Sequence, residues 1–132
     1  MAVFWWFIRV PNDIIFDTGE MTIHGHKITL ELAQTPPQWQ RGLMHRRYMP
    51  SNHGMLFIYD TARQINMWMK NTYIPLDIIF MDQHQKITRI VTDTKPLSEI
   101  KIRSFGNVKY VLELKAGVSK KLGLQVGETF IW

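Results

Sequence analysis

One short segment of the chain combines residue types that could bind or transform a small molecule. It contains Trp68, Lys70, Asn71 and Thr72, and Asp77 follows shortly after them. Side chains two residues apart on an extended strand point to the same face, so Trp68 and Lys70 should share one face. The turn that follows should bring Asp77 back beside them. The segment thus offers an aromatic plane, a cation, a carboxylate and two neutral hydrogen-bonding groups.

Three interpretations of this cluster stay open. The mixture is typical of sites for sugars or small polar metabolites, because a flat ring stacks on the ligand while fixed polar groups orient it. Alternatively, Asn71 and Thr72 only build a turn across which Lys70 and Asp77 pair. A third interpretation makes Lys70 and Asp77 a general acid and base. The sequence shows no nucleophile elbow, phosphate-binding loop or metal triad beside them, and this favours binding over catalysis.

Residues that could hold a metal are few and poorly spaced. The chain has no cysteine, so it has no disulfide, zinc–thiolate site or thiol nucleophile. His24 and His26 flank a predicted turn, but two histidines do not complete a site. Thioethers select Cu(I), yet the methionines of interest lie in apolar runs and suit core packing. We therefore predict no metal and no cofactor.

Length and composition indicate one globular domain over residues 1–132. The chain has 132 residues, of which 45% are hydrophobic and 20% charged, with a formal net charge of +5. A basic protein could bind nucleic acid, but its Lys and Arg residues are scattered, and the tightest groups are only pairs. The charge pattern therefore does not favour a nucleic-acid partner.

The first residues include a short apolar run at positions 3–8 that contains Trp5 and Trp6. It is too short to span a membrane or to serve as the apolar part of a signal peptide. It is predicted to be a buried strand, or else the remnant of a longer exported precursor. The second interpretation favours an exported or cell-envelope protein. In that setting the paired tryptophans could form a sticky edge for a protein partner, which is a further alternative function.

The rest of the chain is typical of short strands separated by turns. Ile28, Leu30 and Leu32 alternate with polar residues, as in a half-buried strand, and Gly25 with His26 suits a hairpin turn. We expect helices only near residues 38–44 and 118–122, the first capped by Thr35. The predicted strands, besides the hairpin over residues 21–33, cover residues 55–59, 65–70, 76–81, 86–92, 108–114 and 129–132.

Four segments resemble, in order, the signature of the family called domain of unknown function 192. They are Gly-Leu-Met-His-Arg at 42–46, Gly-Met-Leu-Phe at 54–57, Trp-Met-Lys-Asn-Thr at 68–72 with Pro-Leu-Asp-Ile-Ile-Phe at 75–80, and Val-Leu-Glu-Leu at 111–114 with Ala-Gly at 116–117. The resemblance covers about residues 28–131 and leaves residues 1–20 unmatched. It implies an all-β sandwich or barrel, export signals in many members and no established activity. On the resemblance alone, Arg46 and Glu113 join the cluster.

Together these observations predict an all-β, single-domain antiparallel sandwich or barrel with one or two short helices. Its predicted function is non-catalytic binding of a small polar molecule or glycan fragment. In this interpretation Trp68 stacks on the ligand, Asn71 and Thr72 hydrogen-bond it, and Lys70 and Asp77 match its charges.

Overall fold

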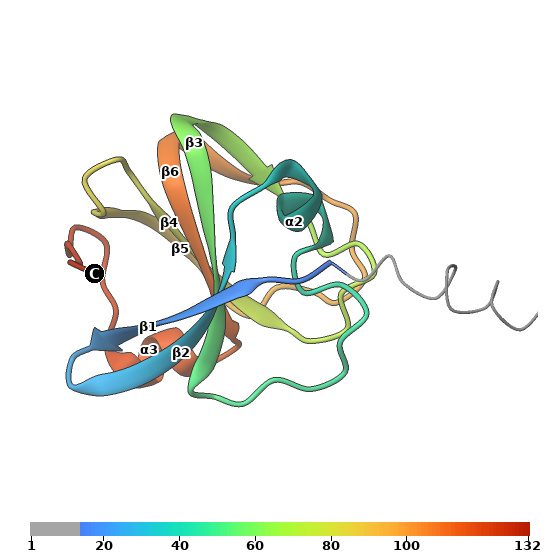
Figure 1. The fold of residues 1–132 in the computed structure, drawn as a ribbon, viewed down its shortest axis with the longest axis horizontal. Coiled ribbons are helices and arrows are strands. Elements are labelled where there is room, and N and C mark those ends of the chain that lie inside the picture. Colours follow the sequence, from blue (N-terminus) through green and yellow to red (C-terminus); the bar gives the residue numbers. More distant parts are fainter. Residues whose placement is uncertain (1–13) are drawn as a thin grey trace, which may run out of the picture.

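The computed structural model describes residues 14–132, which form one six-stranded sheet and two short helices (Figure 1). The strands lie in the order β1-β2-β3-β6-β4-β5. The elements are β1 (Asp17–Ile23), β2 (His26–Ala33), α2 (Pro36–Arg41), β3 (His53–Met67), β4 (Leu76–Met81), β5 (Ile87–Val91), β6 (Ile102–Lys115) and α3 (Val118–Leu122). The prediction of an all-β domain with short helices is confirmed.

The sheet differs from the prediction in its pairing. Strands β2 and β3 run parallel, whereas the other neighbours are antiparallel. A parallel pair needs a long crossover, and the connection through α2 supplies it. The end strands β1 and β5 are not neighbours, so the sheet is not closed into a barrel.

Several predicted boundaries also move. The first hairpin forms, but its turn is His24–Gly25, where both residues have positive φ as a tight primed turn requires. The strands predicted at 55–59 and 65–70 join into one long strand, β3, whose pairing with β6 shifts register before Arg63 and after Gln64. This strand ends at Met67, so the prediction that Trp68 and Lys70 lie on a strand is wrong. Strand β6 begins at Ile102, before the predicted start at residue 108. The strand predicted at 129–132 is wrong, because only Thr129 makes a bridge, to Lys86.

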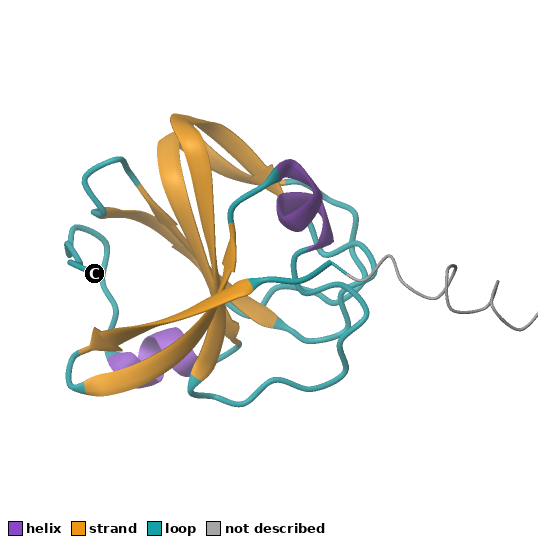
Figure 2. Cartoon of the chain, viewed as in Figure 1, coloured by secondary structure: helices purple, strands orange, loops and turns teal. Residues whose placement is uncertain are grey.

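Each face of the sheet carries its own hydrophobic core. Strand β4 is buried along its whole length, and its side chains alternate between the two cores. Ile78 and Phe80 point into the core on the α2 side, whereas Ile79 and Met81 point into the core on the α3 side. The two helices accordingly lie on opposite sides of the sheet (Figure 2).

Helix α2 begins and ends where its sequence dictates. The Gln38 side-chain oxygen accepts a hydrogen bond from the backbone N–H of Thr35, at 3.2 Å, and Pro36 suits the first turn. Gly42 follows Arg41 with a φ of 47°, so the helix stops before the predicted residue 44. Residues 3–8, with Trp5 and Trp6, lie outside the described residues. Neither helix of the described part is long and apolar enough to cross a membrane.

Candidate functional site

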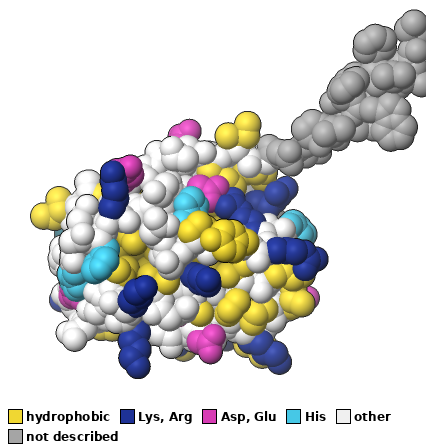
Figure 3. Space-filling view, turned by 90° about the horizontal axis from the view of Figure 1, so that it is seen from below, with side chains coloured by type: hydrophobic (Ala, Val, Ile, Leu, Met, Phe, Trp, Pro, Cys, Tyr) yellow, Lys and Arg dark blue, Asp and Glu magenta, His cyan; other side chains and the backbone are white. Residues whose placement is uncertain are grey.

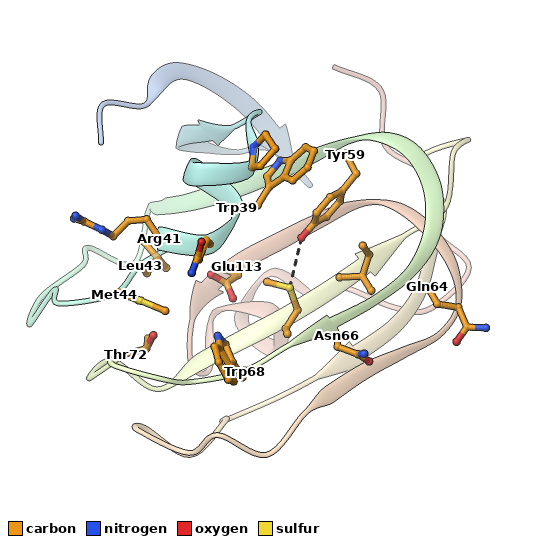
Figure 4. Close-up of a pocket in the computed structure, with 14 residues that line it drawn as sticks. Trp39, Arg41, Leu43, Met44, Tyr59, Gln64, Asn66, Trp68, Thr72 and Glu113 are labelled. Atoms are coloured by element: carbon orange, nitrogen blue, oxygen red, sulfur yellow. Dashed lines mark hydrogen bonds between the residues drawn. The ribbon is translucent and has the colours of Figure 1, made fainter. Parts of the chain in front are cut away.

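A cavity of about 330 Å³ opens between α2, the second half of β3 and the C-terminal part of β6 (Figure 4). Three aromatic residues, two methionines and one carboxylic acid are among the residues that line it. The lining residues are Pro36, Trp39, Gln40, Arg41, Leu43, Met44, Tyr59, Gln64, Ile65, Asn66, Met67, Trp68, Thr72 and Glu113. A cavity of this size and mixed lining is at the small end of the range for ligand sites.

Glu113 is the one carboxylic acid among these lining residues. It lies on β6 opposite Met55 of β3 and Ile78 of β4, and it points to the α2 side of the sheet. Only 4% of Glu113 is exposed, and within residues 14–132 its side chain makes no hydrogen bond or ion pair. Within residues 14–132 every fully buried side-chain nitrogen or oxygen has a partner, so the unpaired carboxyl oxygens of Glu113 are not fully enclosed and are accessible to a ligand from the cavity.

The backbone around Glu113 is tightly packed. A Cβ atom on Gly54 would lie 2.7 Å from the backbone oxygen of Glu113 and 2.8 Å from Leu114 Cδ2. Strand β3 can therefore approach β6 here only because residue 54 has no side chain. This close contact fixes the position from which the Glu113 side chain enters the cavity.

Burial determines the charge of this acid. It raises the pKa of Glu113 to about 8, because an ionised carboxylate loses its hydration in the interior. Burial likewise raises the pKa of Tyr59, and the nearby Glu113 raises it further. The Tyr59 hydroxyl donates to the sulfur of Met67, at 3.7 Å, and not to Glu113. At neutral pH Glu113 is thus mainly an uncharged acid that can both donate and accept a hydrogen bond.

Two tryptophans bound the cavity in different ways. The Trp39 indole N–H donates to the backbone oxygens of Ala33 and Ile58, at 3.0 and 3.1 Å, and its ring centroid is 4.8 Å from that of Tyr59. These contacts hold the Trp39 ring in place as part of the cavity wall. Trp68 is 41% exposed and lies across the opening in Figure 4. Its exposed ring is available to stack on a ligand.

The turn after Trp68 is a rigid structure in its own right. Asn71 has a φ of 53°, and its backbone oxygen accepts a hydrogen bond from the His45 N–H, at 2.8 Å. The Thr72 hydroxyl donates to the backbone oxygen of Lys70, at 3.0 Å, which leaves its oxygen free to accept. Lys70 places its ammonium group 5.1 Å from the centre of the Trp68 ring. Asn71 and Thr72 therefore build the turn, as the structural interpretation proposed.

A second cavity, of about 290 Å³, adjoins the first. The two share four lining residues, Gln40, Arg41, Met44 and Trp68. Lys70 and Asn71 line the second cavity, which we call the outer cavity, whereas Thr72 and Glu113 line the first, which we call the inner cavity. The structure thus places five of the seven predicted site residues around these two cavities.

Asp77 lies on the opposite side of the sheet, away from both cavities. It pairs in register with Leu114, one position from the Ile78–Glu113 pair, so its side chain points to the other face. Its carboxylate accepts four hydrogen bonds, from the backbone N–H groups of Asp93, Gly117 and Ser119 at 3.0 Å each and from the Ser119 hydroxyl at 2.6 Å. The predicted pairing of Lys70 with Asp77 does not form, which removes the acid–base pair suggested for an enzyme.

Arg46 also lies outside the two cavities. It forms a two-pronged ion pair with Glu31, with one bond at 2.8 Å, and Glu31 accepts a third contact from His53 Nε2 at 2.9 Å. The guanidinium carbon of Arg46 lies 5.8 Å from the Phe16 ring centre. These contacts connect β2, the loop after α2 and the start of β3. The expectation that Arg46 joins the Trp68 cluster is therefore wrong.

Sequence reasoning missed several residues of the inner cavity, above all Trp39, Arg41 and Tyr59. They lie about 10 to 30 residues before Trp68 in the chain: the crossover through α2 brings Trp39 and Arg41 to the cavity, whereas Tyr59 lies on β3 itself. The one feature of the sequence that could have pointed to them is Trp39, a tryptophan in a six-residue helix in which no residue is fully buried. A large aromatic residue on such a helix indicates packing or ligand contact, but the sequence does not say with what.

The predicted histidine pair has a structural role. His24 Nδ1 is 2.7 Å from the Leu122 backbone oxygen, and His24 Nε2 is 2.6 Å from a Glu128 carboxylate oxygen. The Leu122 carbonyl, and then Glu128, raise the pKa of His24. His24 thereby ties the first hairpin to the C-terminal segment. No group of three His, Cys, Asp or Glu residues with metal-binding spacing occurs within residues 14–132.

Comparison with known proteins identifies similar solved structures and a family, but it does not provide an activity. A crystal structure from Sinorhizobium meliloti 1021, of a protein described provisionally as a transcription regulator, is 39% identical. It covers 91% of this chain and 97% of that one, with a TM-score of 0.84. A protein of unknown function from Novosphingobium aromaticivorans DSM 12444 is 30% identical over 92% of this chain and 89% of that one, with a TM-score of 0.82. No curated protein matches the chain.

The family model for domain of unknown function 192, described as an uncharacterized ACR family, matches residues 18–132. This range contains the sheet except for Asp17, both helices, and all the residues that line the two cavities except Ile14. The chain therefore belongs to the domain of unknown function 192 family.

Proposed function

We propose that this domain binds a small polar ligand, such as a glycan fragment, in the inner cavity without transforming it. The observation that carries the proposal is Glu113, a buried acid with no hydrogen-bond partner among the described residues, on the wall of a cavity that can admit a ligand. Its carboxyl oxygens are accessible from the cavity, and a ligand that hydrogen-bonds them would gain about 0.5–1.5 kcal/mol for each hydrogen bond.

The other lining residues fit the same role. The exposed ring of Trp68 and the fixed ring of Trp39 provide flat apolar surface for a sugar or a similar ring. Asn66 and the Thr72 oxygen add polar groups at the cavity wall. Aromatic surface with a few fixed polar groups is the arrangement by which proteins orient small polar ligands.

Binding without turnover is favoured by the number of acids. Glycoside hydrolysis generally uses two carboxyl groups on opposite sides of the scissile bond. The inner cavity has one, Glu113, because Asp77 lies on the other face of the sheet. An acid with a pKa of about 8 is nevertheless suited to proton transfer. If turnover were found, Glu113, and not Lys70 or Asp77, would be its acid.

Nucleic-acid binding, suggested by the description of the S. meliloti relative, has less support. On the face drawn in Figure 3, Lys and Arg side chains are separated by apolar and uncharged ones. Proteins that bind nucleic acid generally gather basic residues into a patch or stripe that follows the phosphates. A gel-shift measurement with random duplex DNA at physiological salt would test this alternative directly.

The proposal is tested by a ligand screen with matched variants. A panel of monosaccharides, disaccharides and polar metabolites is screened by ligand-observed NMR against the wild-type chain. Each hit is then titrated against Trp68→Ala and Glu113→Gln. We expect each variant to weaken binding about tenfold or more, the equivalent of at least about 1.4 kcal/mol.

Two control variants separate the cavity from general effects. Trp132→Ala removes a tryptophan that is also 41% exposed but lines neither cavity, and Glu99→Gln removes an exposed acid. Both should bind hits as the wild type does. Equal binding by Trp68→Ala, Glu113→Gln and the wild type would show that the inner cavity is not the site.

A further inference from the structure

The two cavities have opposite chemical character at their far ends. The inner cavity is lined by Glu113, which burial keeps mainly uncharged at neutral pH, and by Arg41, which it shares with the outer cavity. The outer cavity is bordered by Arg41 and Lys70 and has no acidic residue among its lining residues. Trp68 borders both cavities, so one ring surface joins the two ends.

We propose, building on the proposed function, that the ligand is an anionic sugar that occupies both cavities. Its ring lies on Trp68, one of its hydroxyl groups bonds Glu113, and its acidic group lies in the outer cavity beside Arg41 and Lys70.

The two cations of the outer cavity are available for such a group. Neither Arg41 nor Lys70 has a carboxylate within 4.0 Å among residues 14–132, whereas Arg46 and Lys27 each pair with one. Lys70 is held over the Trp68 ring, 5.1 Å from its centre, so its charge stays close to a sugar stacked there. Hydrogen bonds between a cation and a carboxylate or phosphate are about twice as strong as neutral ones.

The inner end selects the opposite part of the ligand. An uncharged carboxylic acid donates one hydrogen bond and accepts others, which matches a sugar hydroxyl. An anionic group beside Glu113 would lose its hydration next to a buried acid, whereas at the outer end Lys70 joins Arg41, and this difference directs the charge of the ligand to the outer end. The arrangement thus fixes the orientation of the ligand as well as its class.

Other ligand classes fit less well. An amine at the inner end would require Glu113 to ionise at neutral pH, against its raised pKa. An amine at the outer end would meet two cations at close range. A neutral sugar fits the ring and the acid but leaves both cations without a partner.

Paired probes test the anionic group directly. D-glucuronic acid, D-galacturonic acid and N-acetylmuramic acid are each compared with their methyl ester, and glucose 6-phosphate is compared with glucose. We expect at least one acidic member to bind about tenfold or more tighter than its neutral partner, with a preference that falls as salt is raised. The carboxylate and phosphate arms identify which acidic group is bound.

The variants Arg41→Gln and Lys70→Gln should each abolish most of this preference, so that the acidic member and its neutral partner bind about equally. Lys101→Gln, an exposed lysine that lines neither cavity, should leave the preference unchanged. Equal binding of acids and neutral partners, with binding still lost in Glu113→Gln, would overturn the anionic ligand but preserve the proposed function. Absence of binding by every sugar, or binding indifferent to Trp68→Ala and Glu113→Gln, would overturn both.

Discussion

Two buried carboxyl groups on neighbouring strands have opposite surroundings. Asp77 on β4 is fully buried and accepts four hydrogen bonds, three from backbone N–H groups and one from Ser119. Glu113 on β6 is 4% exposed and has no partner among the described residues. They lie one register position apart, and the alternation of a strand sends them to opposite faces.

The comparison separates a structural acid from a candidate ligand-binding one. The partners of Asp77 hold the loop at Asp93 and the start of α3 against the sheet, so its hydrogen bonds stabilise the fold. Glu113 stabilises nothing by hydrogen bonding within residues 14–132, and it faces a cavity. Burial alone therefore does not indicate function, whereas burial without partners beside a cavity does.

The largest loss of stability is expected from Asp77→Asn. The amide group replaces one acceptor oxygen by a donor, which then faces the N–H and O–H groups that Asp77 now satisfies. We expect the free energy of unfolding to fall by about 2–4 kcal/mol, measured by urea denaturation at pH 7. Asp93→Asn, a change at an exposed neighbour with positive φ, is the matched control and should cost little. A fall of similar size in both variants would show that the hydrogen bonds of Asp77 are not special.

Glu113→Gln should change how stability depends on pH. The pKa of Glu113 is about 8 in the folded chain and 4.5 ordinarily. Between these values the folded chain holds a proton that the unfolded chain has lost, so the wild-type free energy of unfolding falls as pH rises. Below pH 4.5 both states are protonated, and above about pH 8 the loss is complete. Gln cannot ionise, so the variant lacks this loss.

We therefore expect the variant and the wild type to have similar stability near pH 4.5. Between pH 4.5 and about pH 8 the stability of the wild type should fall by about 1.4 kcal/mol for each pH unit relative to the variant. Near pH 8 the variant should therefore be more stable by a few kcal/mol. Of the charged or titratable groups beside Glu113, Tyr59 and Arg41 are present in both chains, so the difference between the two denaturation curves isolates Glu113. A constant difference from pH 4.5 to 8 would mean that Glu113 has an ordinary pKa.

The smallest effect on stability is expected from Trp68→Ala. Trp68 is 41% exposed, and within residues 14–132 its ring makes a cation–π contact with Lys70 but no hydrogen bond or aromatic pair, so the cost should be about 1 kcal/mol. Trp39→Ala should cost about 3 kcal/mol, because it removes a ring that packs on Tyr59 and donates to two backbone oxygens. Thermal unfolding of both variants checks the contrast. A large fall for Trp68→Ala would place that ring in the core and remove it from the site.

Local patterns in the sequence predicted most of the fold. The alternation around Ile28 and the apolar run over residues 76–81 mark β2 and β4, because such patterns reflect burial on one face or on both. Residues 60–64 are mostly polar, and this concealed that β3 is one continuous strand. The strand runs through them, and they are polar because this stretch of it is mostly exposed. Parallel pairing of β2 with β3 is a long-range property that no local pattern reports.

The site was predictable only in part for the same reason. Trp68 and Lys70 were correctly placed together, because two residues two positions apart need only local geometry. The position of Asp77 was predicted wrongly. The face of the sheet to which its side chain points depends on the register of β4 with β6 and on where the turn ends. Trp39 and Tyr59 reach the cavity through the crossover and the bend of β3, which are consequences of the complete fold.

The central claim, that Glu113 is an unpartnered acid held uncharged beside a cavity, is most directly tested by titrating its carboxyl group. Carbon-13 NMR of the glutamate side-chain carboxyl signals, with Glu113→Gln to assign the resonance, gives its pKa in the folded chain. We expect a value of about 8 and, once a ligand is known, a shift of that pKa when the ligand binds. A pKa near the ordinary 4.5, with no response to ligand, would contradict the account.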